Sequence, residues 1–199
     1  GVKLVVIACN TLTVLGVDTL KGSHAFEIVG MSKGAQLVLA ASSRKKIGVF
    51  ATEFTINSGA HKAAILAADD GADVYPQACP KFVPLIEGEQ FDGAEVRAAV
   101  AEYAAPLKAA GIDTLILSCT HYPFIQKEIE SEFGSEVTVI DPADATAQDT
   151  KTVLAAEGLL RSEGAGTLEV CFTADVERGA RIAGRVLPQG KCLFKEIKL

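Results

Sequence analysis

Short runs of apolar residues, each bordered by polar or turn-forming residues, recur along the chain. A run that is apolar at nearly every position is typical of a parallel β-strand buried on both faces. We therefore predict strands at residues 3–8, 47–51, 114–117, 137–140 and 168–172, and a further strand-like run at 191–197.

Residues 94–109 carry the clearest helical pattern. Apolar side chains recur there at three- and four-residue spacing and form one stripe along the predicted helix. Gly111 stands in the position of a C-terminal cap, and Pro106 is expected to kink or shorten the last turns. The stripe consists of Val96, Ala99, Val100, Tyr103, Ala104 and Leu107.

Further helices are expected at residues 58–68, 123–133 and 175–187. Pro123 suits a first helical turn, and Gly134 suits a helix end. Strands and helices therefore alternate along the chain. This alternation favours an α/β fold with mainly parallel sheets covered by helices.

The composition is that of a globular protein, with 199 residues of which 49% are hydrophobic and 22% are charged. This length allows one large domain or two small ones. The net charge is −6, and the densest basic group, residues 44–46, is interpreted as a solvated strand entrance. A nucleic-acid partner is therefore not expected.

No apolar stretch approaches the ~20 residues of a membrane span, so no membrane partner is expected, and no signal peptide is predicted. The five cysteines are odd in number and spread along the chain. They are interpreted as reduced thiols in a cytoplasm rather than as a disulfide framework. No CxxC pair or Cys/His cluster matches a zinc site, so no metal is expected.

Two segments of the chain have the same local pattern. Residues 5–11 and 115–121 each consist of an apolar strand, one small residue, a cysteine and polar residues that open a helix. In open α/β sheets ligands bind at the carboxyl ends of strands, where the N–H groups of a helix start can hold a carboxylate. Each segment is thus expected to place a thiol, Cys9 or Cys119, beside an anion-binding corner.

Two thiols in this context suit two-sided proton transfer at a carbon atom. A helix N-terminus or a nearby protonated histidine is expected to lower the thiol pKa from its ordinary value near ~8.5. One thiolate then removes an α-proton, and the opposite thiol returns a proton on the other face, with no cofactor. The alternative for either segment alone is that the cysteine is a small core residue.

The remaining cysteines and histidines lack this context. Cys79, which precedes Pro80 in a loop-like stretch, is interpreted as structural, as are Cys171 and Cys192 in strand-like runs. His24 and His61 match no motif and are expected at the surface.

Four stretches resemble motifs of glutamate racemases, and they occur in the order that this family has. Residues 6–11 (VIACNT) are similar to the first-cysteine motif, and residues 115–123 (LILSCTHYP) to the second, where a glycine commonly replaces Ser118. Residues 47–58 (IGVFATEFTINS) and 78–87 (ACPKFVPLIE) resemble the threonine-rich loop and the Cys-Pro to glutamate segment. Relatives that act on aspartate usually lack the His-Tyr-Pro continuation.

The resemblance implies roles at the matching positions. Cys9 and Cys119 are the expected acid/base thiols, His121 is expected to assist Cys119, and Glu87 is expected to lie nearby. The expected contacts to the substrate carboxylate or amino group, or to the cleft that holds it, come from Asn10, Thr11, Thr52, Thr55 and Thr120.

The resemblance also implies two similar α/β domains around a central cleft, with one cysteine from each. We estimate the second domain as residues 45–141, inserted between 1–44 and 142–199 of the first. The implied reaction is racemisation of L- and D-glutamate without a cofactor, which supplies D-glutamate for bacterial peptidoglycan. The implied partners are the small-molecule substrate and, plausibly, a second copy of the chain.

The family normally begins with a strand that ends in an Asp-Ser-Gly loop, and a later loop contains Tyr-Gly. Neither precedes Cys9, so the first domain is expected to lack its N-terminal part and to leave an open strand edge. We therefore expect the chain alone to be weak or inactive and prone to associate.

Three other functions stay open at this point. The chain could be a catalytically impaired module that binds an acidic amino acid or a partner, or a purely structural module with core cysteines. A cysteine hydrolase that uses Cys119 and His121 is disfavoured, because it gives Cys9 no role and no third residue is evident to orient the histidine.

Overall fold

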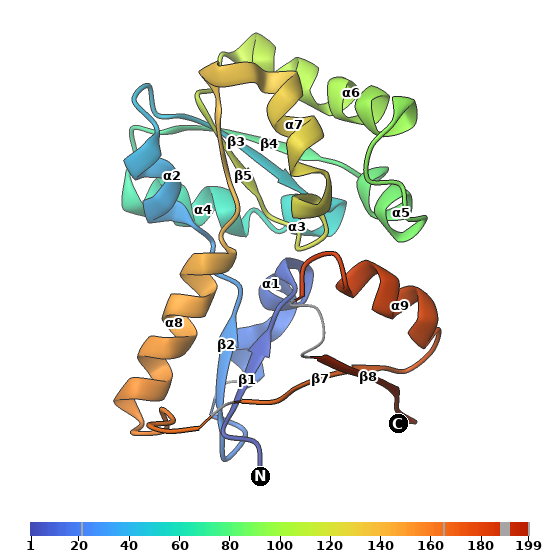
Figure 1. Ribbon diagram of the computed structural model, residues 1–199. Helices are drawn as coiled ribbons and strands as arrows, with labels where there is room; N and C mark the ends of the chain where they lie inside the picture. Colours follow the sequence, from blue (N-terminus) through green and yellow to red (C-terminus); the bar gives the residue numbers. More distant parts are fainter. Residues whose placement is uncertain (21, 165, 188–191, 199) are drawn as a thin grey trace. The chain divides into compact units, whose positions relative to one another are not determined.

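The computed structural model describes residues 1–20, 22–164, 166–187 and 192–198 (Figure 1). The chain divides into two compact units, Gly1–Leu160 and Arg161–Leu199. The first unit holds two parallel sheets, and the second holds one small parallel sheet. No helix among the described residues is long and apolar enough to cross a membrane.

The first sheet of the larger unit pairs β1 (Leu4–Ile7) with β2 (Glu27–Gly30) in parallel. Helix α1 (Asn10–Leu20) connects them, and helix α8 (Ala143–Ala156) returns to the same sheet. Two threonine hydroxyls join these elements. The hydroxyl of Thr13 accepts from the backbone N–H of Met31 at 3.0 Å. That of Thr146 accepts from the N–H of Ser32 at 3.0 Å.

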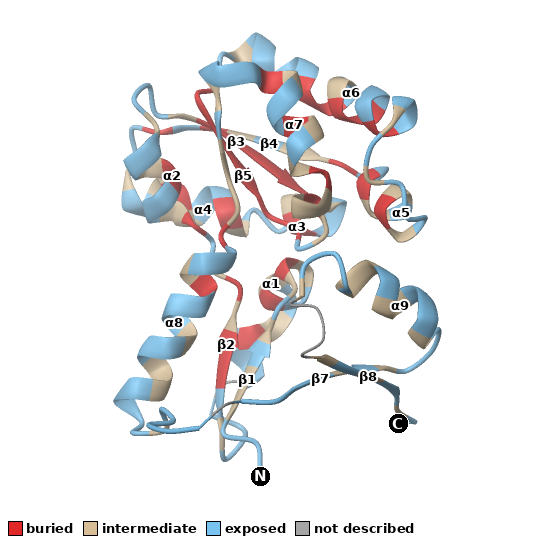
Figure 2. Ribbon diagram, viewed as in Figure 1, coloured by how far each residue is buried: buried red, intermediate tan, exposed pale blue. Residues whose placement is uncertain are grey.

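The second sheet has four parallel strands in the order β4-β3-β5-β6. These strands are β3 (Lys46–Ala51), β4 (Asp73–Ala78), β5 (Thr114–Leu117) and β6 (Thr138–Ile140). All of them fall within the predicted second domain, but its boundaries stay a prediction. Strands β3 and β5 are central and nearly fully buried, so their continuous apolar sequence agrees with a sheet covered on both faces (Figure 2).

Helices cover both faces of the four-stranded sheet. On one face, Phe50, Leu115 and Leu117 pack in a core with the helices α5 (Phe82–Glu87), α6 (Ala94–Ala110) and α7 (Gln126–Phe133). On the other face, Ile47, Val49 and Ile116 pack with α2 (Ala35–Ala41) and α4 (Ala60–Ala68). A short helix, α3 (Glu53–Asn57), follows β3 directly, with Thr52 as its N-cap.

The smaller unit consists of strands β7 (Leu168–Phe172) and β8 (Cys192–Glu196), paired in parallel, and helix α9 (Val176–Ala183). Strand 168–172 is confirmed at both ends. The predicted helix 175–187 is shorter than expected, because its C-cap is Gly184. Lys191, the first residue of the predicted strand 191–197, lies outside the described residues.

The stripe predicted for residues 94–109 is confirmed, since all six of its members are buried in α6. Gly111 caps this helix with φ 70°, and Gly134 ends α7 with φ 67°. The expected shortening at Pro106 is wrong, because α6 continues to Ala110. Pro106 is exposed, so water can satisfy the carbonyl group that its missing N–H leaves free.

His61 contradicts the expectation of a surface histidine. Its side chain is 3% exposed on α4, and neither ring nitrogen has a hydrogen-bond partner among the described residues. Burial, together with the charge of Lys33, lowers the pKa of His61 from 6.5 to about 4. The folded state therefore favours the neutral imidazole.

This lowered pKa predicts a loss of stability in mild acid. Because the unfolded chain binds the proton more tightly, His61 destabilises the fold progressively as the pH falls from about 6.5 towards 4, by about 2–3 kcal/mol in total. We expect His61→Leu to remove this part of the pH dependence, and the surface replacement His24→Leu to keep it. Urea unfolding at pH 7.5 and pH 4.5 measures both. Equal acid sensitivity of wild type and His61→Leu would contradict the assignment.

Candidate active site

Both predicted thiols lie just beyond the carboxyl end of a strand. Cys9 lies between β1 and α1 and is partly buried. Cys119 follows β5 by two residues and is 8% exposed. All five cysteines are free thiols, and the charge of Cys9 raises the pKa of Cys119, so the two groups are close enough to interact.

His121 and Glu87 extend the site from Cys119. The Sγ atom of Cys119 is 4.0 Å from Nδ1 of His121, and Nε2 of His121 is 2.7 Å from Oε1 of Glu87. The sequence therefore correctly predicted that these residues lie together. When the imidazole is neutral, the carboxylate favours the proton on Nε2 and leaves the lone pair of Nδ1 facing the thiol. Glu87 is thus a third residue that orients the histidine, which contradicts the expectation that none is present.

The expected lowering of the Cys119 pKa is also wrong. Burial raises the pKa of this thiol, hydrogen bonds from the backbone N–H groups of His121 and Tyr122 lower it, the charge of Cys9 raises it, and the net pKa is raised. Burial wins because the thiolate loses its hydration in the core. Cys119 therefore rests as a protonated thiol at neutral pH, which suits a proton donor.

Three threonine hydroxyls form a cluster where α1 meets α3. The Oγ1 atom of Thr11 lies 3.0 Å from that of Thr52 and 3.2 Å from that of Thr55, and the latter two are 3.1 Å apart. Thr52 is also the N-cap of α3, because its hydroxyl accepts from the N–H of Thr55. The structure thus brings three of the predicted substrate contacts together.

The other two predicted contacts differ in their surroundings. Asn10 is 3% exposed at the start of α1, and its Nδ2 donor has no hydrogen-bond partner among the described residues. A buried amide donor without a partner is costly, so this atom is available to a ligand oxygen. Thr120 is exposed and lines a cavity of about 420 Å³ together with Ala8. Asn10 and Thr120 directly follow Cys9 and Cys119 in the sequence.

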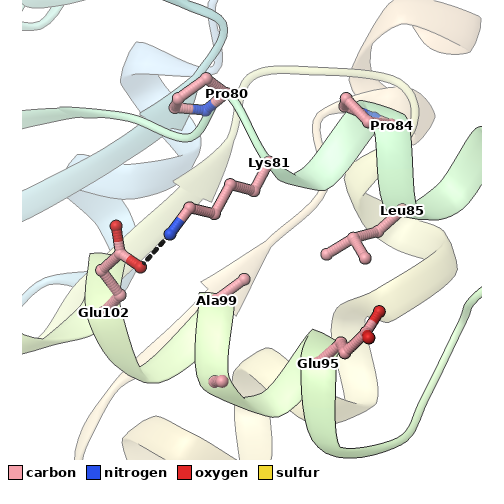
Figure 3. Close-up of a pocket in the computed structure, with 8 residues that line it drawn as sticks. Pro80, Lys81, Pro84, Leu85, Glu95, Ala99 and Glu102 are labelled. Atoms are coloured by element: carbon pink, nitrogen blue, oxygen red, sulfur yellow. Dashed lines mark hydrogen bonds and ion pairs between the residues drawn. The ribbon is translucent and has the colours of Figure 1, made fainter.

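A second cavity, of about 520 Å³, lies between α5 and α6 (Figure 3). It has an apolar floor that includes Pro84, Leu85 and Ala99, and an ion pair joins Lys81 to Glu102 at one end. None of the predicted site residues lines this cavity. Across the described part of the chain, no group of three or more His, Cys, Asp and Glu side chains is placed to hold a metal ion.

The other cysteines divide between core and surface. Cys79 is fully buried, as the structural interpretation expects, and burial raises the pKa of its thiol far above the ordinary value. Cys171 is exposed, which contradicts a role in the core. Tyr122 was not singled out from the sequence, although it stands within the second-cysteine motif in an apolar segment, and it is fully buried directly after His121.

Comparison with known proteins defines the class of this protein. Residues 1–150 match the family profile described as Asp/Glu/Hydantoin racemase. The chain belongs to this racemase family, and it is therefore an isomerase.

Comparison with individual relatives shows which kind of racemase the chain is similar to. The chain is 38% identical to a glutamate racemase of Lysinibacillus sphaericus (strain C3-41) over 100% of this chain and 76% of that protein. A solved glutamate racemase isoform from Bacillus anthracis superposes with a TM-score of 0.89, at 31% identity over 100% of this chain and 74% of that one. The glutamate racemase from Francisella tularensis in complex with D-glutamate has a TM-score of 0.85, at 26% identity over 100% and 73%. These similarities confirm the predicted resemblance and the α/β racemase fold.

Proposed function

We propose that this protein interconverts L- and D-glutamate without a cofactor, with Cys9 and Cys119 as the two acid/base groups. The observation that carries the proposal is the linked set of Cys119, His121 and Glu87 at the end of β5, with a second thiol near enough to change the pKa of the first. The substrate is inferred from the relatives, which are named glutamate racemases.

The reaction starts with one of the two cysteines as a thiolate and the other as a protonated thiol. In one direction the thiolate of Cys9 removes the α-proton and becomes a thiol. The electron pair left on the α-carbon is delocalised into the substrate carboxylate, and the thiol of Cys119 delivers its proton to the opposite face. The product leaves Cys119 as thiolate and Cys9 as thiol, so the reverse reaction starts from the exchanged state.

His121 supports the half of the cycle in which Cys119 is the base. The raised pKa of Cys119 makes its thiolate hard to form unaided. The Nδ1 atom of His121 can take the proton of this thiol, and Glu87 then stabilises the imidazolium through Nε2. The same pair returns the proton when Cys119 acts as the acid.

The substrate is held by polar groups at the starts of α1 and α3. The free Nδ2 donor of Asn10 and the hydroxyl cluster of Thr11, Thr52 and Thr55 are suited to a carboxylate or an ammonium group. Thr120 adds a hydroxyl and a backbone N–H beside Cys119. We expect these contacts to hold the α-carbon between the two thiols.

The proposed product indicates in which compartment of the cell the protein acts. D-Glutamate is a building block of bacterial peptidoglycan, so we place the enzyme in the cytoplasm where its precursors are made. A homodimer is the proposed assembly.

Conversion of L-glutamate followed by circular dichroism tests the proposed activity. We expect the optical signal of L- and of D-glutamate to decay to zero, and L-aspartate and L-alanine to keep their signals over the same time. The absence of any decay would overturn the proposed activity and would instead agree with the expectation from the sequence that the chain alone is weak or inactive. A protein that racemises aspartate faster than glutamate would overturn the proposed substrate. Addition of a metal chelator is expected to leave the rate unchanged.

Glu87→Gln is expected to lower kcat about tenfold with little change in KM. The amide keeps the shape of the side chain but removes the charge that stabilises protonated His121, and such acid–base assistance contributes ~10²–10⁴-fold when removed entirely. Glu95→Gln on α6 is the matched control, since Glu95 lines the separate cavity between α5 and α6. Steady-state kinetics in both directions measure the effect. Equal kcat values for the two variants would contradict the role of Glu87.

A further inference from the structure

Tyr122 is fully buried directly after His121, and the proposed chemistry gives it no part. Its ring packs edge-to-face on Phe82 with the centroids 5.0 Å apart, and Phe82 packs in the same way on Tyr103 at 5.2 Å. Phe82 is the first residue of α5, and Glu87 is the last. Tyr122 therefore lies between the turn that carries Cys119 and the helix that carries the partner of His121.

The hydroxyl of Tyr122 makes a long-range bond to the backbone. It donates to the carbonyl oxygen of Cys79 at 3.3 Å. The N–H of Cys79 donates in turn to the carbonyl of Ala51 at 2.9 Å. The turn after β5 is thereby fastened to the ends of β3, which is the neighbour of β5 in the sheet, and of β4, which is the next strand beyond it.

The backbone of the same residue faces the thiol. The N–H of Tyr122 donates to the carbonyl of Cys119 at 3.0 Å. The backbone N–H groups of His121 and Tyr122 also lower the pKa of the Cys119 thiol and so oppose the effect of its burial. These two donors act only while the turn from Cys119 to Tyr122 holds its shape.

We propose that Tyr122 is a positioning residue for Cys119, whose hydroxyl anchors the turn from Cys119 to Tyr122 so that its backbone N–H groups stay beside the sulfur. The inference rests on the proposed catalytic role of Cys119. It goes beyond that role, because it assigns the stability of the thiolate to a bond made 43 residues away along the chain.

The test measures thiol chemistry rather than turnover, so that it can fail independently of the proposed function. The rate of iodoacetamide alkylation of each cysteine is followed against pH by peptide mass spectrometry, in the wild type and in Tyr122→Phe. The phenylalanine keeps the ring between its neighbours and removes only the hydroxyl. We expect Cys119 to alkylate at least about threefold more slowly at pH 8 and its titration to move to higher pH, with Cys9 unchanged.

Tyr103→Phe is the matched control. It also removes a buried tyrosine hydroxyl that bonds this backbone stretch, since Tyr103 accepts from the N–H of Lys81 at 3.3 Å. It does not bond the carbonyl of Cys79. We expect its Cys119 titration to equal that of the wild type. An unchanged titration in Tyr122→Phe, or an equal shift in both variants, would overturn the proposal.

If Tyr122→Phe does not fold, hydrogen exchange in the wild-type protein tests the proposal instead. The proposal predicts that the amides of His121 and Tyr122 exchange as slowly as those in the middle of α6. Exchange as fast as that of the exposed residue Thr120 would show a loose turn and would overturn it.

Discussion

Cys119→Ser is expected to lower the rate of glutamate racemisation by at least about 10³-fold, and Cys9→Ser by a similar factor. A serine hydroxyl holds its proton far more tightly than a thiol, so it can neither remove the α-proton nor hold the negative charge that follows. General acid–base groups contribute ~10²–10⁴-fold, and each variant loses one of two such groups. Both variants are expected to bind D-glutamate with little loss, because the polar contacts to the substrate remain.

Cys171→Ser is the matched control for these variants. Cys171 is an exposed thiol in strand β7 of the smaller unit, so its replacement removes a cysteine to which the proposed chemistry gives no role. Optical rotation follows the rate from either enantiomer, and titration calorimetry follows binding of D-glutamate. Racemisation by Cys9→Ser at more than a tenth of the wild-type rate would contradict the role given to that thiol.

Asp113→Ala is expected to lower the free energy of unfolding by about 3 kcal/mol. Asp113 is 8% exposed directly before β5, and its carboxylate accepts from the hydroxyls of Ser42 and Ser43 and from the N–H of Arg44. Removal of the carboxylate breaks three hydrogen bonds to a charged group, which contribute about 1.5–3 kcal/mol each when they are buried, and the exposure of Ser43 and Arg44 keeps the total loss below their sum. Urea unfolding at pH 7 measures the change.

Asp73→Ala is a control at the same level of the sheet. Asp73 in β4 is the register partner of Lys46 in β3. On the other side of β3, the backbone N–H of Asp113 donates to the carbonyl of the same Lys46. Asp73 is exposed, so its loss is expected to change stability by less than about 0.5 kcal/mol. Similar losses in the two variants would contradict the assignment of a buried carboxylate network.

The contribution of Asp113 has a defined pH dependence. Burial would raise the pKa of this carboxyl, but the hydrogen bonds from Ser42, Arg44 and Ser43 outweigh burial and lower it. A pKa below that of the unfolded chain stabilises the fold above the ordinary carboxyl range, and this stabilisation is lost as the pH falls through the lowered pKa. The difference between wild type and Asp113→Ala is therefore expected to shrink in strong acid.

Much of the fold could be predicted from the sequence, because burial and apolar pattern coincide in its central elements. Strand β5 matches the predicted residues 114–117, and all six members of the predicted stripe of α6 are buried. Both elements are buried on the sides where their sequence is apolar, so the apolar pattern is sufficient to predict them. Strand β4 was missed because it contains Pro76, which an edge strand tolerates and a central strand does not.

The site was only partly predictable for a different reason. The sequence motifs placed Cys119 and His121 together because they are two residues apart. The contact of His121 with Glu87 joins positions 34 residues apart and was expected only through the family resemblance. The net direction of the Cys119 pKa was missed, because it depends on how much water the fold removes from the sulfur. Burial of His61 was missed because a lone histidine carries no pattern.

The central claim is that two thiols act on opposite faces of one α-carbon, and the isotope content after brief reaction in D₂O tests it most directly. Glutamate of one enantiomer, with protium at its α-carbon, is converted by a few per cent in D₂O. The remaining substrate and the new product are then separated and analysed by NMR. We predict deuterium at the α-carbon of nearly all the product and of almost none of the remaining substrate, in both directions. Product that retains the original proton, or substrate that gains deuterium as fast as product forms, would show that a single group serves both faces and would contradict the account.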